Sequence, residues 1–267
     1  MEKHDGKIEE RISDSLLHIE QNENVKILFA VESGSRAWGF ESKDSDYDVR
    51  FVYIHPLKWY LQLETTKEVL EYPVQGDIDL SGWDVKKALW LFAKSNPTIF
   101  EWIKSPVVYI DDCGFRKKLL SMENQFFSPR AGMYHYLNMA KGNLQKHLLR
   151  EKILWKKYFY VLRPLFACMW IEKYLTPPPM KFEKLANAVV SDCALKEKIF
   201  SLVKRKKSGR EMQKIQRIDV FHEFFDKKIE HFENIVSKMP DKKIDIKILD
   251  ELFFEILNDE NCKSDKL

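Results

Sequence analysis

A glycine-serine turn followed by two alternating carboxylates constrains this chain of 267 residues more than any other feature. The turn, Gly34-Ser35, follows an apolar run at 25–31 that is typical of a buried strand. Because Gly34 has no Cβ, the backbone can turn sharply and approach a phosphate, to which Ser35 offers a hydroxyl and the backbone N–H groups of the turn offer more donors. The pattern therefore predicts a phosphate-binding turn. It is not of the Walker type, since no Gly-Lys-Ser/Thr follows.

The two carboxylates open a second apolar run, which ends at Ile54. Ten residues separate Ser35 from Asp46, and Asp46 and Asp48 lie two apart, so in a strand they project from one face. Ionised neighbours repel unless a cation lies between them, and Mg²⁺ binds through one or two carboxylates plus substrate phosphates. We predict a Mg²⁺ site here, with Mn²⁺ as a substitute. Asp44 shares the alternation but lies in a loop, where capping of a turn is the competing interpretation.

A third carboxylate is predicted in the strand near 77–81. A second metal ion needs its own anchor if one ion is to activate an attacking hydroxyl. Asp79 lies inside this strand and is favoured, whereas Asp77 follows a glycine and is more typical of a turn. The sequence therefore predicts two metal ions bound by Asp46, Asp48 and Asp79.

Longer phrases surround these residues. They are Gly34-Ser-Arg-Ala-Trp-Gly39, Ser45-Asp-Tyr-Asp48, Asp79-Leu-Ser-Gly-Trp-Asp84, Lys94-Ser-Asn-Pro97, Glu101-Trp102 and Lys156-Lys-Tyr-Phe-Tyr-Val-Leu-Arg-Pro164. The phrases resemble the nucleotidyltransferases of the DNA polymerase beta superfamily, and in particular the predicted nucleotidyltransferases of the RNA repair pathway, polymerase-beta-like family. The resemblance runs from about residue 26 to 180 and implies a small mixed sheet carrying three carboxylates, then a helical domain that helps to hold a nucleotide. It leaves the acceptor open among RNA ends, proteins and small molecules.

The hydrophobic periodicity predicts mixed strands and helices up to about residue 111 and helices after it. With the resemblance, this implies an α+β fold with a nucleotidyltransferase domain at 1–111 and a helical domain at 112–267. In the first domain we expect a helix at 6–22 and a second helix at 85–94 with Asp84 as its N-cap. The expected strands are 25–32, 47–55, 67–72, 77–81 and 107–110. In the second domain, a break at Ser128-Pro129 is followed by a long helical tract from 130 to 175 and by helices at 181–206, 211–238 and 247–257.

Charge and composition fit a cytoplasmic enzyme. Up to residue 110 there are 13 Lys/Arg against 19 Asp/Glu, a balance of −6; the remainder, 31 against 22, carries +9. No stretch approaches the roughly 20 apolar residues that span a bilayer, and the charged start is not followed by an apolar segment typical of a signal peptide. The four cysteines are scattered, as expected of reduced thiols.

One basic stripe of the helical half is predicted to face the nucleotide. Lys156, Tyr160 and Arg163 recur at helical spacing, with Lys157 adjacent. Lysines could neutralise a triphosphate and a tyrosine could stack on a base, although an exposed basic helix is the plain alternative. The run at 204–207 could contact an RNA acceptor only if it faces the same site.

The function expected from these features is a magnesium-dependent nucleotidyltransferase. ATP or another NTP would bind with its phosphates on Gly34 and Ser35, an acceptor hydroxyl would attack the α-phosphorus, and pyrophosphate would leave. Asp79 could also take the proton of the hydroxyl. Arg36 follows the turn and could contact phosphate, or instead form a salt bridge to Asp44 or Glu41. A regulatory pseudoenzyme that binds nucleotide without turnover and a metal-dependent phosphohydrolase remain as alternatives.

Overall fold

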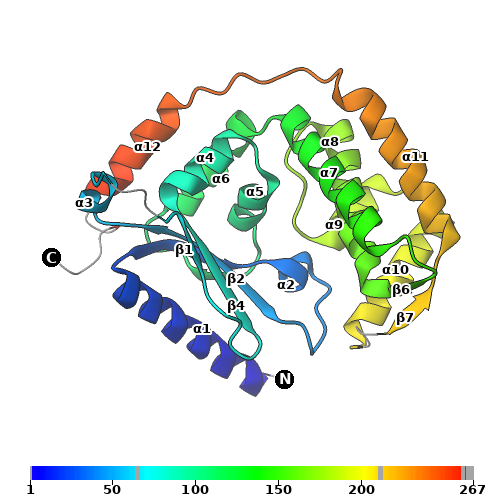
Figure 1. Cartoon of the computed structure of the whole chain (residues 1–267), viewed down its shortest axis with the longest axis horizontal. Helices are drawn as coiled ribbons and strands as arrows, with labels where there is room; N and C mark the ends of the chain where they lie inside the picture. The colour runs from blue at the N-terminus through cyan, green and yellow to red at the C-terminus, as the bar shows by residue number, and fades with distance from the viewer. Residues whose placement is uncertain (1, 64–66, 210–212, 260–261, 263–267) are drawn as a thin grey trace.

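The computed structural model describes residues 2–63, 67–209, 213–259 and 262, and it confirms the α+β class. Its N-terminal half places a mixed sheet between helices (Figure 1). The elements of this half are α1 (Glu2–Glu23), β1 (Lys26–Glu32), α2 (Gly34–Trp38), β2 (Tyr47–Ile54), α3 (Leu57–Tyr60), β3 (Val69–Glu71), β4 (Ile78–Asp84), α4 (Val85–Ala93), α5 (Pro97–Ile103) and β5 (Val108–Ile110).

The five strands lie in the order β3-β4-β2-β1-β5. Strands β2 and β4 are parallel, whereas β1 pairs antiparallel with β2 and with β5, and β3 pairs antiparallel with β4. The parallel register sets Asp48 directly opposite Asp79. All five expected strands are present with small shifts at their ends, and the topology brings the second and third predicted carboxylates side by side.

Each face of the sheet has its own hydrophobic layer. Helix α1 covers one face, where Ile12 and Leu16 pack with strand residues such as Phe51. The other face packs against α4, α5 and α6 (Phe115–Phe126), with Phe29 stacked on Phe115 at 6.2 Å between ring centroids. Asp84 caps α4 by accepting a hydrogen bond from the Lys86 N–H at 2.8 Å, which confirms the predicted N-cap.

The helical half is more interrupted than predicted. The single tract expected from 130 to 175 is wrong, because the chain leaves α7 (Pro129–His147), forms strand β6 (Lys152–Leu154) and a 3₁₀ turn (Trp155–Tyr158), and only then enters α8 (Phe159–Tyr174). Strand β6 pairs with β7 (Lys214–Gln216), and Ile153 lies opposite Ile215. This pairing joins segments far apart in sequence, so no local periodicity could indicate it.

One more predicted helix is divided, and another is shorter than predicted. Instead of one helix at 181–206 there are α9 (Phe182–Val189) and α10 (Cys193–Lys207), because Asp192 caps a new helix by accepting from the Leu195 N–H at 2.9 Å. The helix expected at 211–238 is confirmed only from Asp219 to Val236, as α11. Residues 210–212 lie outside the described residues, and β7 occupies 214–216.

The last helix, α12 (Lys247–Asn258), returns to the N-terminal half. It lies beside α4 and α3 in Figure 1, and the ring of Phe253 meets that of Tyr60 at 5.2 Å between centroids. The predicted domain boundary at 111/112 therefore divides the chain along its sequence only. In space, α12 from the second segment packs against helices of the first. Within the ranges that the structure describes, no helix combines the length and the apolar character needed to cross a membrane.

Candidate active site

The predicted phosphate turn lies at the carboxyl end of β1, where the chain enters the short helix α2. Gly34 adopts a left-handed φ of 59°. A Cβ at this position would overlap the Oδ2 atom of Asp48 and lie 2.9 Å from its Cγ atom. Gly34 is therefore required both by its own backbone angle and by the close approach of the Asp48 carboxylate to the turn.

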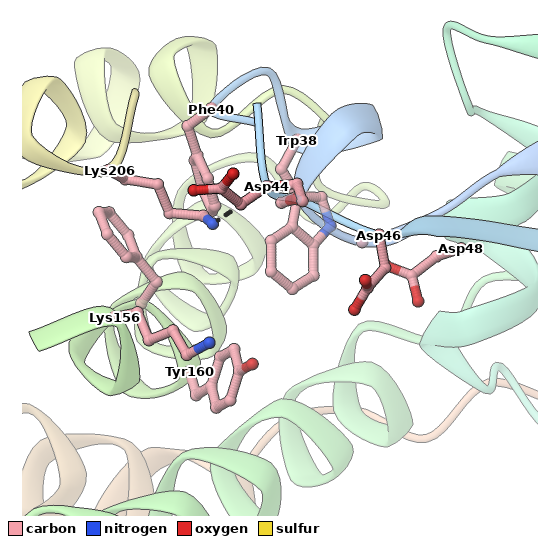
Figure 2. A pocket seen from close by; sticks show the side chains of 12 residues that line it. Trp38, Phe40, Asp44, Asp46, Asp48, Lys156, Tyr160 and Lys206 are labelled. Atoms are coloured by element: carbon pink, nitrogen blue, oxygen red, sulfur yellow. Dashed lines mark hydrogen bonds between the residues drawn. The ribbon is translucent and has the colours of Figure 1, made fainter. Parts of the chain in front are cut away.

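One cavity of about 320 Å³ joins this turn to the helical half. Figure 2 shows Asp46 and Asp48 on one side and Lys156, Tyr160 and Lys206 on the other. Six of the residues singled out as site candidates line it: Gly34, Ser35, Asp46, Asp48, Lys156 and Tyr160. The remaining lining residues are Trp38, Phe40, Asp44, Ser45, Phe159 and Lys206.

Asp46 lies in the loop before β2 and is exposed, rather than in the strand as expected. Its neighbour Tyr47 is the first strand residue, since the Tyr47 N–H donates to the Asp77 carbonyl at 2.7 Å. Asp46 and Asp48 nevertheless line the same cavity. Asp77 points elsewhere, because its carboxylate pairs with Arg11 at 3.3 Å on the surface.

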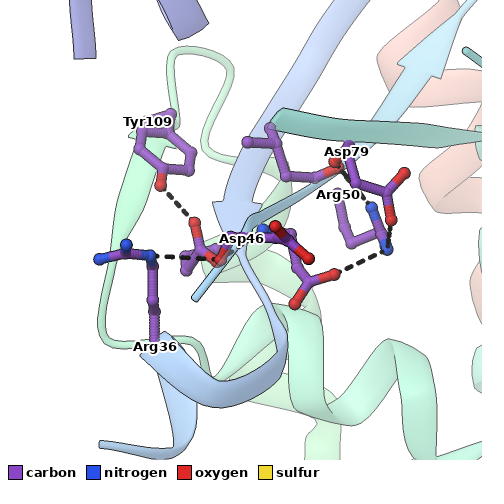
Figure 3. Close-up of polar contacts among 8 residues, drawn as sticks. Arg36, Asp46, Arg50, Asp79 and Tyr109 are labelled. Carbon is purple, nitrogen blue, oxygen red and sulfur yellow. Dashed lines mark hydrogen bonds and ion pairs between the residues drawn. The ribbon is translucent and has the colours of Figure 1, made fainter. Parts of the chain in front are cut away.

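A cation that the sequence analysis missed lies between Asp48 and Asp79. The Arg50 Nη2 atom donates to Asp79 Oδ2 at 2.7 Å and to Asp48 Oδ1 at 3.3 Å (Figure 3). Burial raises the pKa of Asp48. Arg50 opposes this shift, whereas the negative charges of Asp79 and Asp46 raise the pKa of Asp48 further. The signal was present in the sequence, since Arg50 follows Asp48 by two residues in a strand.

The carboxylates of the cavity provide only part of the ligands that a metal ion needs. In the part of the chain that the structure describes, no three His, Cys, Asp or Glu side chains are grouped so as to hold an ion. Asp46 and Asp48 both face the cavity and provide the one or two carboxylates through which Mg²⁺ binds when substrate phosphates supply further oxygens. Asp79 has its Oδ2 atom bound to Arg50.

A buried carboxyl, Glu32, holds the start of β2 in place. Its Oε1 atom accepts a hydrogen bond from the Asp48 N–H at 2.8 Å, and its Oε2 atom accepts one from the Tyr109 hydroxyl (Figure 3). Burial raises the pKa of Glu32 to about 7, while these two hydrogen bonds oppose the shift. Glu32 therefore fixes the backbone that carries Asp48, a role that no local sequence pattern indicated.

Arg36 supports the loop that carries Asp46. Its Nη2 atom donates to the Ser45 carbonyl at 2.8 Å and its Nε atom to the Asp46 carbonyl at 3.3 Å. The guanidinium carbon lies 3.6 Å from the centroid of the Tyr47 ring. These contacts give Arg36 a positioning role that the expected alternatives, a phosphate contact or a salt bridge to an acidic neighbour, did not include.

The basic stripe of the helical half divides between cavity and surface. Lys156 and Tyr160 line the cavity, whereas the Lys157 ammonium lies 4.3 Å from the centroid of the Tyr160 ring. Burial lowers the pKa of Lys157, and repulsion from Lys156 and Lys146 lowers it further. Lysines therefore gather at this end of α7 and in the 3₁₀ turn, beside the cavity.

Arg163 is only 3% exposed and lies behind the cavity wall. Its Nη1 atom pairs with Glu101 at 2.6 Å, and Glu101 also accepts from the Tyr136 hydroxyl at 2.9 Å. The guanidinium carbon lies 4.6 Å from the centroid of the Trp38 ring, which does line the cavity. Because its charge is held by Glu101, we assign Arg163 to supporting Trp38 and not to direct contact with nucleotide.

Lys206 brings the basic run of α10 to the cavity. It is 6% exposed, and its Nζ atom donates to Ser45 Oγ at 3.4 Å. Ser45 Oγ also accepts from the Ser42 N–H at 3.0 Å, so the turn before Asp46 is contacted by Lys206 from one side and by Arg36 from the other. Of the run at 204–207, Lys206 is the member that lines the cavity.

The cavity thus joins the phosphate turn, the carboxylates Asp46 and Asp48, and lysines from the helical half. A family model described as the RNA repair pathway DNA polymerase beta family matches residues 8–255. The chain belongs to this family. The resemblance inferred from the phrases around Gly34 and Asp79 is thereby confirmed and extended over most of the chain, and it supports a nucleotidyltransferase-like activity.

Two individual proteins are also similar to this chain. Uncharacterized protein YcgL of Bacillus subtilis (strain 168) is 44% identical over 239 residues, which cover 90% of this chain and 92% of that protein. The crystal structure of a nucleotidyltransferase-like protein from Exiguobacterium sibiricum 255-15 has a TM-score of 0.30 and 11% identity, and the match covers 95% of this chain and 81% of that one.

Proposed function

We propose that this protein is a magnesium-dependent nucleotidyltransferase that transfers an NMP from an NTP, with ATP the first candidate, to an acceptor hydroxyl. The observation that carries the proposal is one cavity lined by the Gly34-Ser35 turn, by Asp46 and Asp48, and by Lys156 from the helical half. Its volume of about 320 Å³ lies within the range of small-molecule sites. The family's description makes RNA the first acceptor to test, before protein and small-molecule hydroxyls.

The chain would contribute position and charge. The turn at Gly34 and Ser35 brings backbone and hydroxyl donors to the phosphates, while Lys156 offers a positive charge across the cavity. Asp46 and Asp48 would hold Mg²⁺, which supplies neutralisation of the triphosphate when bound. The acceptor hydroxyl would attack the α-phosphorus in line and pyrophosphate would leave. Asp79 is the candidate to take the proton, and it would anchor a second ion only with nucleotide bound, because Arg50 otherwise holds its Oδ2 atom.

Aromatic side chains would hold the base. Trp38 and Phe40 line the cavity with Tyr160, and the Trp38 and Phe40 rings meet edge to face at 5.6 Å between centroids. Arg163 stacks behind Trp38 and so fixes its ring. Stacking surfaces accept any base, which is why the cavity by itself favours an NTP without selecting one.

The test is release of pyrophosphate. The protein is incubated with Mg²⁺, each α-labelled NTP in turn, and separate pools of RNA, protein and small-molecule acceptors, with Asp48→Asn as the matched inactive control. The proposal expects label in one acceptor pool together with equimolar pyrophosphate, both absent in the variant. Nucleotide binding without either product would favour the pseudoenzyme, and release of phosphate without label transfer would favour the phosphohydrolase.

A further inference from the structure

Arg50 occupies the position between two carboxylates where a cation is expected. Its guanidinium contacts the side chains of both Asp48 and Asp79. It is also anchored by backbone, since the Nη1 atom donates to the Asp79 carbonyl at 2.9 Å and to the Val49 carbonyl at 3.1 Å. The side chain is 19% exposed. Four contacts therefore hold a permanent positive charge at this point of the sheet.

The fold makes this arrangement unavoidable. Arg50 and Asp48 project from the same face of β2, and the parallel register places Asp79 of β4 opposite Asp48. Three charged side chains, two acidic and one basic, thus share one small area of the sheet. Arginine suits this place because its rigid fork of donors can bind two carboxylates and two carbonyls together.

Resting on the proposed function, we propose that Arg50 is a positioning residue that keeps the Asp48 and Asp79 pair closed to free divalent ions. An ion approaching these oxygens has to compete with the bonds that Arg50 makes and meets the repulsion of its charge. Asp46 and Asp48 both line the cavity, and the Asp48 Oδ2 atom lies against the turn at Gly34. Divalent ions are therefore bound at the cavity together with nucleotide phosphates, and only weakly by the protein alone.

The experiment measures binding of Mn²⁺ alone, followed by the electron paramagnetic resonance signal of the free ion. Arg50→Gln removes the charge and is expected to bind Mn²⁺ roughly tenfold more tightly than the wild type, or better. The matched control is Arg11→Gln, which removes an arginine paired with a carboxylate at 3.3 Å on the exposed surface. It changes the net charge equally and is expected to leave Mn²⁺ affinity unchanged.

Two further variants keep the inference falsifiable if Arg50→Gln does not fold. Arg50→Lys retains the charge and is expected to bind Mn²⁺ nearly as weakly as the wild type. Asp79→Asn in the presence of Arg50 is expected to change Mn²⁺ affinity less than about threefold, because Asp79 is already closed. When Arg50→Gln folds, adding Asp79→Asn to it is expected to abolish the gain.

The outcomes separate this inference from the proposed function. It is overturned if the wild type binds Mn²⁺ as tightly as Arg50→Gln, if Arg11→Gln produces the same gain, or if Asp79→Asn alone weakens binding tenfold. A merely structural role of Arg50 would lower affinity and melting temperature together and would not raise affinity. Failure of the wild type to release pyrophosphate would refute the proposed function while leaving the Mn²⁺ comparison valid.

Discussion

Replacing Gly34 by alanine tests how closely the phosphate turn and Asp48 are joined. Alanine at a left-handed φ costs about 1–2 kcal/mol. Its Cβ would overlap Asp48 Oδ2, so the carboxylate has to move and give up its 3.3 Å contact with Arg50, a further loss of about 0.5–1.5 kcal/mol. We therefore expect the free energy of unfolding to fall by roughly 2–3 kcal/mol.

The chain offers a matched control in Gly39. It also has a left-handed φ, of 83°, but a Cβ there meets no atom of the described residues within 4 Å beyond its own neighbours along the chain. Gly39→Ala should therefore lose only the backbone part, about 1–2 kcal/mol. Urea denaturation gives both stabilities, and calorimetry with Mg²⁺ and ATP gives both affinities. Nucleotide affinity should fall at least about tenfold in Gly34→Ala and little in Gly39→Ala. A folded Gly34→Ala protein with the affinity of Gly39→Ala would refute this reasoning. The larger Gly34→Val change should act in the same direction.

Three other expectations follow from the same geometry. Asp46→Asn and Asp48→Asn should each reduce transfer by roughly 100-fold or more, measured as pyrophosphate release, and near-normal rates in either folded variant would contradict their assignment. Lys156→Met should weaken NTP binding by about 1.5–3 kcal/mol and NMP binding much less. Lys157→Met removes a charge outside the cavity and should weaken the binding of both ligands only slightly. Equal small losses in both variants would show that this segment is an ordinary exposed basic surface. Burial raises the pKa of Asp84 to about 6, so the protonated form favours folding, and this stabilisation is lost as pH rises from 3.8 through 6. The wild type should thus lose about 3 kcal/mol relative to Asp84→Asn over this interval in urea denaturation, and parallel pH profiles would show that Asp84 is not the group concerned.

Local sequence patterns were sufficient for the sheet and for one side of the site. The alternation after Asp46, the glycine before Ser35 and the capping position of Asp84 each depend on neighbours a few residues away, and the five strands and the N-cap are confirmed. The expectation that Asp79 would join Asp48 came from its place inside the predicted strand at 77–81 and from the need for a third carboxylate. The register of β2 and β4 now gives its physical basis.

Features that depend on distant segments could not be predicted in this way. Lys206 reaches Ser45 from the end of α10, and its neighbours in a uniformly basic run gave no sign of which lysine turns inward. The pairing of β6 with β7 broke a helical pattern that looked continuous. Arg50 was predictable in principle, because it shares a strand face with Asp48. The sequence predicts a metal ion between Asp48 and Asp79, where the structure has the positive charge of Arg50.

The return of α12 to α4 bears on the order in which the chain can fold during synthesis. Leu89 and Trp90 of α4 line one hollow together with Leu249 and Phe253 of α12, which is synthesised well after the whole sheet. Until then, apolar surface of the N-terminal layer stays uncovered, even though every strand of its sheet has already been made. The N-terminal segment is therefore complete in secondary structure long before it is complete in packing. A fragment ending near residue 111 would carry the whole sheet and still expose a surface that favours aggregation.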